Sequence, residues 1–305
     1  MHCSRKEEKQ MVEHDKLQQT LMHLFMIILV LCCVLPFLLM VMASFTEEQT
    51  LIRNGYSFFP EKFSLETYRY IFRSANTIFK GYFMTIFVTV VGTLCNISMT
   101  VLFAYPLSRK DLPYRSGLSF FLFFTMLFNG GLVPTYMMYA NTFHIKNTIW
   151  ALIIPSLMMN AFYVIMMRSF FTSSIPDSLI EAAKLDGASE MKILTRVILP
   201  LSKPMLVTLV LMVGLNYWND WMNGMYYVND NSLNTIQMIL NNMIQNVEFL
   251  SRSASVLGAD AAKIKMPTVG IRMGIAVIAV LPVMVIYPFL QKYFVKGIVV
   301  GGVKG

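Results

Sequence analysis

The chain has 305 residues, of which 56% are hydrophobic and only 14% are charged, and its formal net charge is +8. A soluble protein of this length needs more charge to cover its surface, so the composition excludes a soluble globular fold and indicates a lipid environment. The excess of basic residues does not indicate nucleic-acid binding, because these residues lie between apolar runs rather than along one stripe.

Long stretches without charge predict the membrane spans, since a helix needs roughly 20 mostly apolar residues to cross the hydrocarbon core. We predict an all-α integral membrane protein with six transmembrane helices, at about 21–44, 81–105, 117–139, 147–168, 204–225 and 272–291. Asp220 interrupts the fifth of them. Together the spans predict one permease domain over 21–296, between a polar N-terminal lead over 1–20 and a tail over 297–305.

The first span follows a basic flank, as the core of a cleaved signal peptide does. Its apolar stretch from Leu21 to Ser44 is much longer than such a core, and no small-residue cleavage site follows before Glu47. We therefore expect a retained helix. Most of the 25 lysines and arginines fall in the segments that are cytoplasmic when the N-terminus is inside, which predicts that both termini are cytoplasmic.

The polar segment 176–204, between the fourth and fifth spans, predicts two short helices joined at a turn. Pro176 suits the first turn of a helix, and Ser178 with Glu181 has the spacing of a capping box. Gly187 can take the left-handed conformation that closes such a helix.

A second short helix is expected from 188 to 198, before Pro200 and Pro204 end it and start the next span. Two interpretations of this pattern remain open. The segment is either an amphipathic linker at the membrane surface or a rigid lever on which a soluble motor acts.

The residues of this segment resemble the EAA loop of ABC importer permeases, through the runs Glu181-Ala182-Ala183, Asp186-Gly187-Ala188 and Leu199-Pro200-Leu201-Ser202-Lys203-Pro204. In that family the loop docks in a cleft of the ATP-binding subunit. The resemblance implies this coupling role here for Glu181, Ala182, Ala183, Asp186, Gly187 and Ala188. It also implies that Glu181 meets a basic residue of the ATPase.

Three further stretches, 104–113, 128–136 and 287–297, are similar to the carbohydrate branch of these permeases, the MalG type, and especially to its LplC/YtcP-like members. The resemblance implies the MetI-like importer fold and half of a pathway for a sugar or oligosaccharide, in a multi-pass protein of a bacterial cell membrane. The implied partners are a second, different permease subunit, a cytoplasmic ATP-binding subunit dimer and an extracellular sugar-binding lipoprotein. The tail is either a frayed end or, as in these relatives, reaches toward the ATPase dimer interface.

A sugar pathway needs aromatic faces and side chains that form hydrogen bonds. The fifth span supplies the candidates Asn216, Tyr217, Trp218, Asn219 and Asp220, and Asn129 and Tyr136 are further ones. An acid at membrane depth tends to face the protein interior or water, as a pathway residue would. Asp220 lies near the predicted outer boundary, however, so an interfacial position beside tryptophans is the alternative.

No catalytic site is expected. The chain lacks a Gly-x-x-x-x-Gly-Lys-Ser/Thr loop, so ATP and Mg would be bound by the partner ATPase and the chain itself needs no cofactor. The four cysteines show no Cys-x-x-Cys spacing, and no metal site is expected. The alternatives to an ABC permease are an ion-coupled secondary transporter, which commonly shows paired repeats that are absent here, and a membrane scaffold that does not transport.

Overall fold

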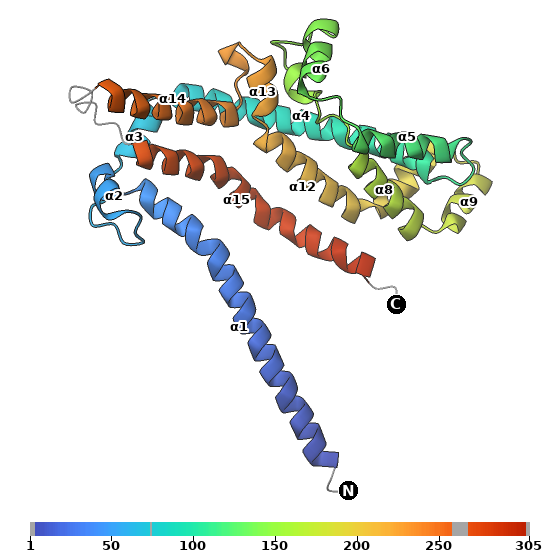
Figure 1. The fold of residues 1–305 in the computed structure, drawn as a ribbon. Helices are drawn as coiled ribbons and strands as arrows, with labels where there is room; N and C mark the ends of the chain where they lie inside the picture. Colours follow the sequence, from blue (N-terminus) through green and yellow to red (C-terminus); the bar gives the residue numbers. More distant parts are fainter. Residues whose placement is uncertain (1–3, 74, 258–267, 303–305) are drawn as a thin grey trace. The chain divides into compact units, whose positions relative to one another are not determined.

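In a computed structural model the chain is built from helices, with a single isolated antiparallel bridge between Thr46 and Phe63 among the described residues, which are 4–73, 75–257 and 268–302. Figure 1 shows the elements in chain order. The helices are α1 Ser4–Ser44, α2 Glu48–Asn54, α3 Glu66–Phe72, α4 Ala75–Ser108, α5 Arg115–Leu127, α6 Leu132–Met137, η1 Met138–Thr142, α7 Trp150–Ile153, α8 Ala161–Ser174, α9 Asp177–Leu185, α10 Glu190–Ile193, η2 Leu194–Ile198, α11 Leu199–Leu201, α12 Lys203–Asn219, α13 Met222–Tyr227, η3 Asn231–Leu233, α14 Ile236–Leu257 and α15 Thr268–Gly302.

The chain forms two compact units. Unit 1 comprises Met1–Arg73 with Asn246–Ile278, and unit 2 comprises Ser74–Gln245 with Ala279–Gly305. In unit 1 the carboxylate of Glu48 accepts hydrogen bonds from the backbone N–H groups of Val269 and Gly270, both at 2.9 Å. These are N–H groups of the first turn of α15, which have no partner within the helix, so Glu48 satisfies them and complements the helix dipole.

Three helices in the described part of the chain are long and apolar enough to cross a membrane: Gln18–Ser44, Ala75–Ser108 and Val269–Ile286. Two bent pairs also qualify when each is counted as one span, Arg115–Leu127 with Leu132–Thr142, bent by 112°, and Glu190–Leu201 with Lys203–Asn219, bent by 83°. Several of the predicted spans are therefore not continuous helices.

The predicted helix 117–139 breaks at 128–131, where Gly131 takes a φ of +87° and its N–H donates to the Asn129 side chain at 2.8 Å. The predicted helix 204–225 ends at Asn219 and is followed by the separate short helix α13. These breaks depend on local glycine and asparagine geometry that an apolar run conceals.

The predicted helix 147–168 is also wrong as a single helix, because the chain leaves the helical conformation between α7 and α8 and Ser156 has a φ of +61°. Irregular backbone at membrane depth is tolerated only where its polar groups find partners. Three side chains from other helices supply them here. Tyr217 donates to the Ile153 carbonyl at 2.9 Å, Asn223 to the Pro155 carbonyl at 2.9 Å and Asn96 to the Leu157 carbonyl at 2.6 Å.

Replacing Asn96 with leucine should destabilise the protein by about 1–3 kcal/mol, because the carbonyl of the half-buried Leu157 would lose its donor. The midpoint of thermal unfolding in detergent measures this loss. Thr100→Val is the matched control, since the buried Thr100 hydroxyl donates to the Asn96 side chain one turn earlier in α4 and does not contact the break itself. If Thr100→Val lowered the unfolding midpoint as much as Asn96→Leu or more, the Asn96 side chain would not be what stabilises the break between α7 and α8.

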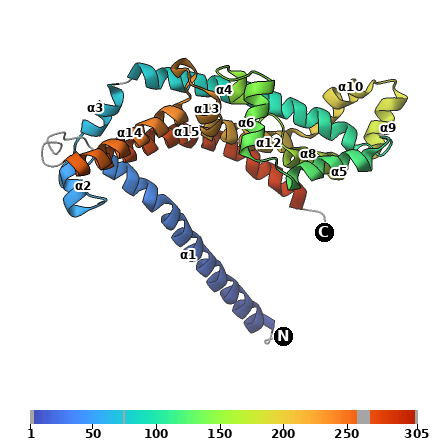
Figure 2. The same cartoon turned by 45° about the horizontal axis from the view of Figure 1, so that its top comes forward.

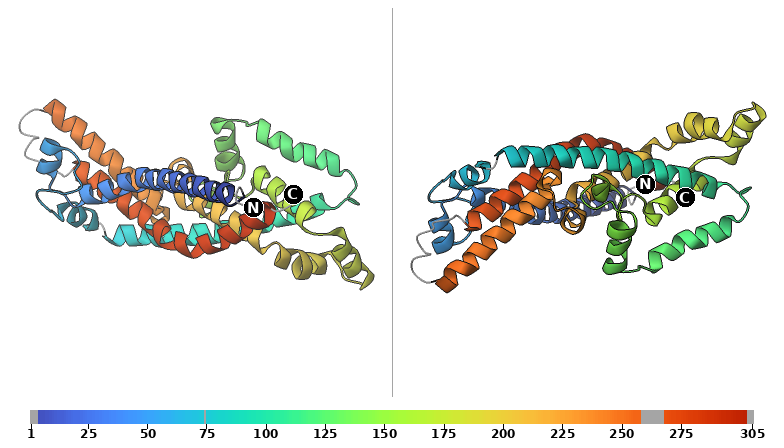
Figure 3. Two further views of the ribbon diagram at one scale, coloured as in Figure 1. Left: turned by 90° about the horizontal axis from the view of Figure 1, so that it is seen from below. Right: turned by 90° about the horizontal axis from the view of Figure 1, so that it is seen from above.

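α4 is the central helix of unit 2 and contacts both α8 and α12. Gly92 permits the close approach of α12, since a Cβ at this position would lie 2.5 Å from the ring of Tyr217. The core formed around these helices also includes Ile180, Ile193 and Ile198 from the segment after α8. Figure 2 shows α9 and α10 together at one end of α4, and in both panels of Figure 3 this segment projects from the rest of unit 2.

Candidate functional site

α9, Asp177–Leu185, ends in a glycine turn. Gly187 has a φ of +74°, its N–H donates to the Lys184 carbonyl at 3.0 Å, and the Ala188 N–H donates to the Ala183 carbonyl at 3.0 Å. This pair of bonds is a Schellman motif, which needs a left-handed residue and favours glycine. The prediction that Gly187 closes the helix is confirmed.

The predicted start of α9 is wrong in detail. Pro176 lies at the N-cap with an extended backbone rather than in the first turn, and no side chain caps the helix, so Ser178 and Glu181 do not form a capping box. The chain then continues through α10, a π-helical turn at Leu194–Ile198 and α11, and it bends by 83° into α12.

The segment 176–204 presents one face to the core and another to the solvent. Ile180, Ile193, Leu194 and Ile198 are buried in the core of unit 2. The six predicted coupling residues lie away from that core or at its margin: Glu181, Ala182, Asp186 and Gly187 are exposed, and Ala183 and Ala188 are half-buried. The structure therefore brings these six residues together on a short, anchored segment.

Leu185 is an exposed apolar residue that no motif in the sequence indicates. Its side chain is 89% exposed on the last turn of α9, next to Asp186. An isolated exposed leucine needs no explanation in general. Here it stands among the predicted docking residues, so it extends their surface with an apolar group. Its position within the segment 176–204 was the one feature of the sequence that could have indicated a docking role.

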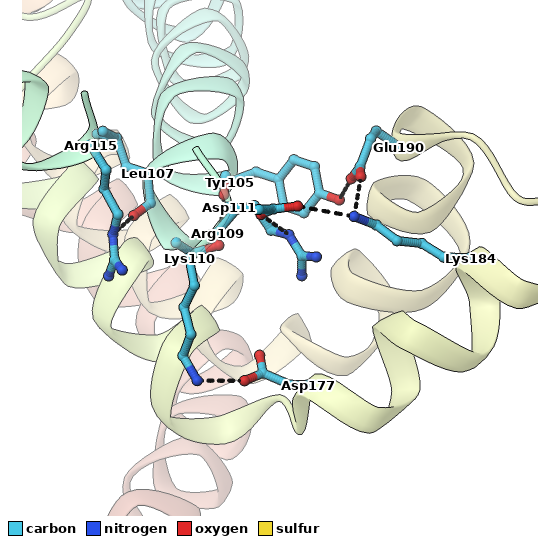
Figure 4. Close-up of polar contacts among 10 residues, drawn as sticks. Tyr105, Leu107, Arg109, Lys110, Asp111, Arg115, Asp177, Lys184 and Glu190 are labelled. Carbon is cyan, nitrogen blue, oxygen red and sulfur yellow. Dashed lines mark hydrogen bonds and ion pairs between the residues drawn. The ribbon is translucent and has the colours of Figure 1, made fainter. Parts of the chain in front are cut away.

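A chain of polar contacts ties the loop to the end of α4 (Figure 4). Lys184 lies 3.2 Å from Asp111 Oδ2 and 3.0 Å from Glu190 Oε1. The Tyr105 hydroxyl donates to Glu190 Oε2, and Lys110 donates to Asp177 Oδ2 at 2.7 Å. Sequence spacing did not indicate these contacts, because the partners are up to 85 positions apart.

The oppositely charged groups of this network stabilise one another in their charged forms. The hydrogen bond from Lys184 lowers the pKa of the Asp111 carboxyl, and the hydrogen bond from Lys110 lowers that of Asp177. Hydrogen bonds to Glu190 and Asp111 raise the pKa of the Lys184 ammonium. All three groups are therefore charged at neutral pH.

The candidate pathway residues of the fifth span occupy different environments. Tyr217 is buried in the core, whereas Asn216 is exposed and donates from Nδ2 to the Tyr163 hydroxyl at 2.8 Å. Asn219 is exposed at the end of α12. Asp220 is half-buried and follows the helix as its C-cap, where it accepts from the Asn223 N–H at 3.4 Å.

Trp218 lines an apolar groove of about 390 Å³ between α4, α12 and the later part of α15. Thr89 and Thr93 line the same groove. Among the described residues, the Trp218 indole N–H and both threonine hydroxyls are buried without a hydrogen-bond partner. Such groups are costly unless a partner reaches them.

The two remaining candidates lie on the segment of α6 and the turn before it. Asn129 is exposed, and its side chain is used in the turn with Gly131. Tyr136 stacks on Tyr227 with ring centroids 5.5 Å apart, and Lys146 donates to its hydroxyl at 3.2 Å. The structure thus separates the seven candidates into several places rather than one.

Comparison with protein families decides the classification. Residues 112–300 match the family of binding-protein-dependent transport system inner membrane components. The chain belongs to this family. The matched range includes the whole segment 176–204, and the permease is accordingly a multi-pass inner-membrane component of a transport system.

Two relatives from Bacillus subtilis are each 38% identical to the permease. The polygalacturonan/rhamnogalacturonan transport system permease protein YtcP matches over 95% of this chain and 99% of its own length. Protein LplC matches over 89% and 90%, respectively. These matches confirm the resemblance to the carbohydrate branch and to its LplC/YtcP-like members.

A solved structure shares the fold. A chain from a crystal structure of a bacterial ABC transporter involved in the import of the acidic polysaccharide alginate superposes with a TM-score of 0.77 at 27% identity, covering 92% of this permease and 98% of that chain. The all-α fold class of ABC importer permeases is thereby confirmed, and so is the function of a permease subunit in such an importer.

Proposed function

We propose that the permease forms half of the translocation pathway for oligosaccharides derived from polysaccharides, and that a cytoplasmic ATPase drives it through segment 176–204. The observation that carries this proposal is the short helix α9, closed by Gly187 and anchored in the core by Ile180, with its remaining face open to a partner. ATP binding would close the motor and move the bundle between inward-facing and outward-facing states.

The proposal includes partners that supply what this chain lacks. A dimeric ATP-binding subunit binds ATP and Mg, because the chain has no phosphate-binding loop of its own and acts only as a transport subunit. A second, different permease completes the pathway, and an extracellular sugar-binding lipoprotein delivers the substrate. Both termini then lie in the cytoplasm, on the side of the ATPase. The contact of the tail with the ATPase would involve the side chains of 297–305, which lie outside the described residues.

Acidic oligosaccharides are the proposed substrate class. One relative is named for polygalacturonan and rhamnogalacturonan, and the structural neighbour belongs to an importer of the acidic polysaccharide alginate. Both names denote polymers that contain uronic acids. Uronic-acid oligomers are therefore the substrates to test first.

Within the pathway, Trp218 is the candidate with the best support. Its indole offers an aromatic face and an N–H that finds no partner in the described part of the chain, and Thr93 adds a hydroxyl to the same groove. Sugars present apolar C–H faces and hydroxyl groups, which such a groove complements. Asn216 and Asp220 are secondary candidates, whereas the Tyr217 hydroxyl is already used by the Ile153 carbonyl.

Uptake by the reconstituted complex tests the function. Oligogalacturonates should enter proteoliposomes only with ATP, the ATPase and the binding protein, and neutral maltooligosaccharides should enter poorly. Trp218→Phe should lower uptake by roughly 5- to 150-fold, as expected when a buried polar contact to substrate contributing about 1–3 kcal/mol is lost. Uptake that continues without any ATPase would instead establish an ion-coupled transporter, and a complex that moves no sugar would establish a scaffold.

A further inference from the structure

α9 is held along one side by a neighbouring segment. Asp177 and Lys184 are seven residues apart, about two helical turns, so they lie on the same side of the helix. The adjacent residues Lys110 and Asp111, in the connection after α4, reach these two points at 2.7 and 3.2 Å. Two contacts two turns apart restrain both the position of the helix and its rotation about its axis.

Lys184 also joins this side of α9 to the helix that follows the glycine turn. Its ammonium lies 3.0 Å from Glu190 Oε1, while the other oxygen of that carboxylate accepts from the Tyr105 hydroxyl. Tyr105 is only 7% exposed and belongs to the core of unit 2. The ammonium of Lys184 thus contacts the connection after α4 directly and α4 itself through Glu190 (Figure 4).

The energies of these contacts suit a positioning role better than a role in folding. The ion pairs of Lys184, Asp111 and Asp177 are at least one-third exposed, and pairs of this kind contribute little to the free energy of folding. The buried face of α9 holds the loop against the bundle. The ion pairs then define which way the exposed face points and how α9 is set against α10.

We infer that Lys184, with Asp111 and Glu190, connects the coupling loop, residues 176–204, rigidly to the cytoplasmic end of α4. The two parts then move as one body when the ATPase acts. This inference rests on the proposed function, because it assigns a transmission role to residues that do not themselves dock. It adds Lys184, Asp111, Lys110, Asp177, Glu190 and Tyr105 to the coupling machinery.

Lys184→Met removes the charge and keeps most of the length of the side chain, so it tests this connection in the assembled importer. The ATPase should still co-purify with the complex. Uptake at a given rate of ATP hydrolysis should fall about fivefold or more, because fivefold is the smallest effect that a typical coupling free energy between two sites produces. Lys184→Arg should restore coupling. Lys192→Met is the matched control, since Lys192 is exposed on α10 and makes no ion pair among the described residues.

The pair Lys110–Asp177 gives an independent test by charge exchange. Lys110→Asp alone should reduce coupling, because it places two acids together, and adding Asp177→Lys should restore it. Coupling equal to wild type in Lys184→Met and Lys110→Asp would overturn the inference. A loss of uptake that only follows loss of the ATPase would also overturn it, because Lys184 would then be a docking residue. A wild-type complex without ATP-driven uptake would refute the proposed function instead.

Discussion

Replacing Gly187 with proline should release the ATPase from the purified complex and reduce ATP-driven uptake by at least about tenfold, the factor that corresponds to 1.4 kcal/mol. Proline fixes φ near −65°, whereas Gly187 has a φ of +74°, and it also removes the N–H that bonds to the Lys184 carbonyl. The turn that orients α9 against α10 cannot form in this variant. Co-purification of a soluble ATPase and uptake in proteoliposomes measure the two effects.

Gly187→Asn is the matched control for this variant. Asparagine adopts the left-handed conformation more readily than other residues with a side chain, and a Cβ at position 187 would meet no atom within 4 Å. The asparagine variant should therefore retain most of the ATPase. If proline and asparagine at this position had the same effect, the backbone conformation of the turn would not be what the ATPase requires.

Replacing Leu185 with aspartate should weaken binding of the ATPase roughly 30-fold or more, the effect of losing an interface residue that contributes 2 kcal/mol. The side chain is 89% exposed, so the substitution leaves the folding of the permease unchanged. In the proposed complex the same side chain is buried against the ATPase, where an unpaired carboxylate is costly. Titration of the detergent-solubilised permease complex with its purified ATPase gives the affinity.

Phe59→Asp provides the comparison for Leu185→Asp. Phe59 is 87% exposed in the segment between α2 and α3, which the charge distribution predicts to be extracellular. The Phe59→Asp permease should bind the ATPase with wild-type affinity. Equal affinity of wild type and Leu185→Asp would exclude the end of α9 from the docking surface.

Local chemistry explains which features could be predicted from the sequence. Gly187 was predictable, because a positive φ at a helix end is a property of a few neighbouring residues. The long apolar runs of α1, α4 and α15 were visible for the same reason. The EAA residues were identified from the motif, and four of them, Glu181, Ala182, Asp186 and Gly187, are exposed and therefore accessible to a partner.

Features that depend on distant contacts could not be predicted. The break between α7 and α8 lies in an apolar run, and it is tolerated because Asn96, Tyr217 and Asn223 satisfy the freed carbonyls. The network around Lys184 likewise joins segments that are far apart in sequence. Tyr217 was a pathway candidate from its residue type alone, whereas its burial follows from the close approach of Gly92.

The most direct test of the account is the location of residue 186. Asp186 is exposed beside the glycine turn, so Asp186→Cys in a chain without its four native cysteines gives a single reporter on the coupling loop. The account predicts that this cysteine cross-links to the ATPase and that a membrane-impermeant thiol reagent labels it only from the cytoplasmic side. Labelling from the outside, or ATP-driven uptake in a complex where residue 186 contacts only lipid headgroups, would contradict it.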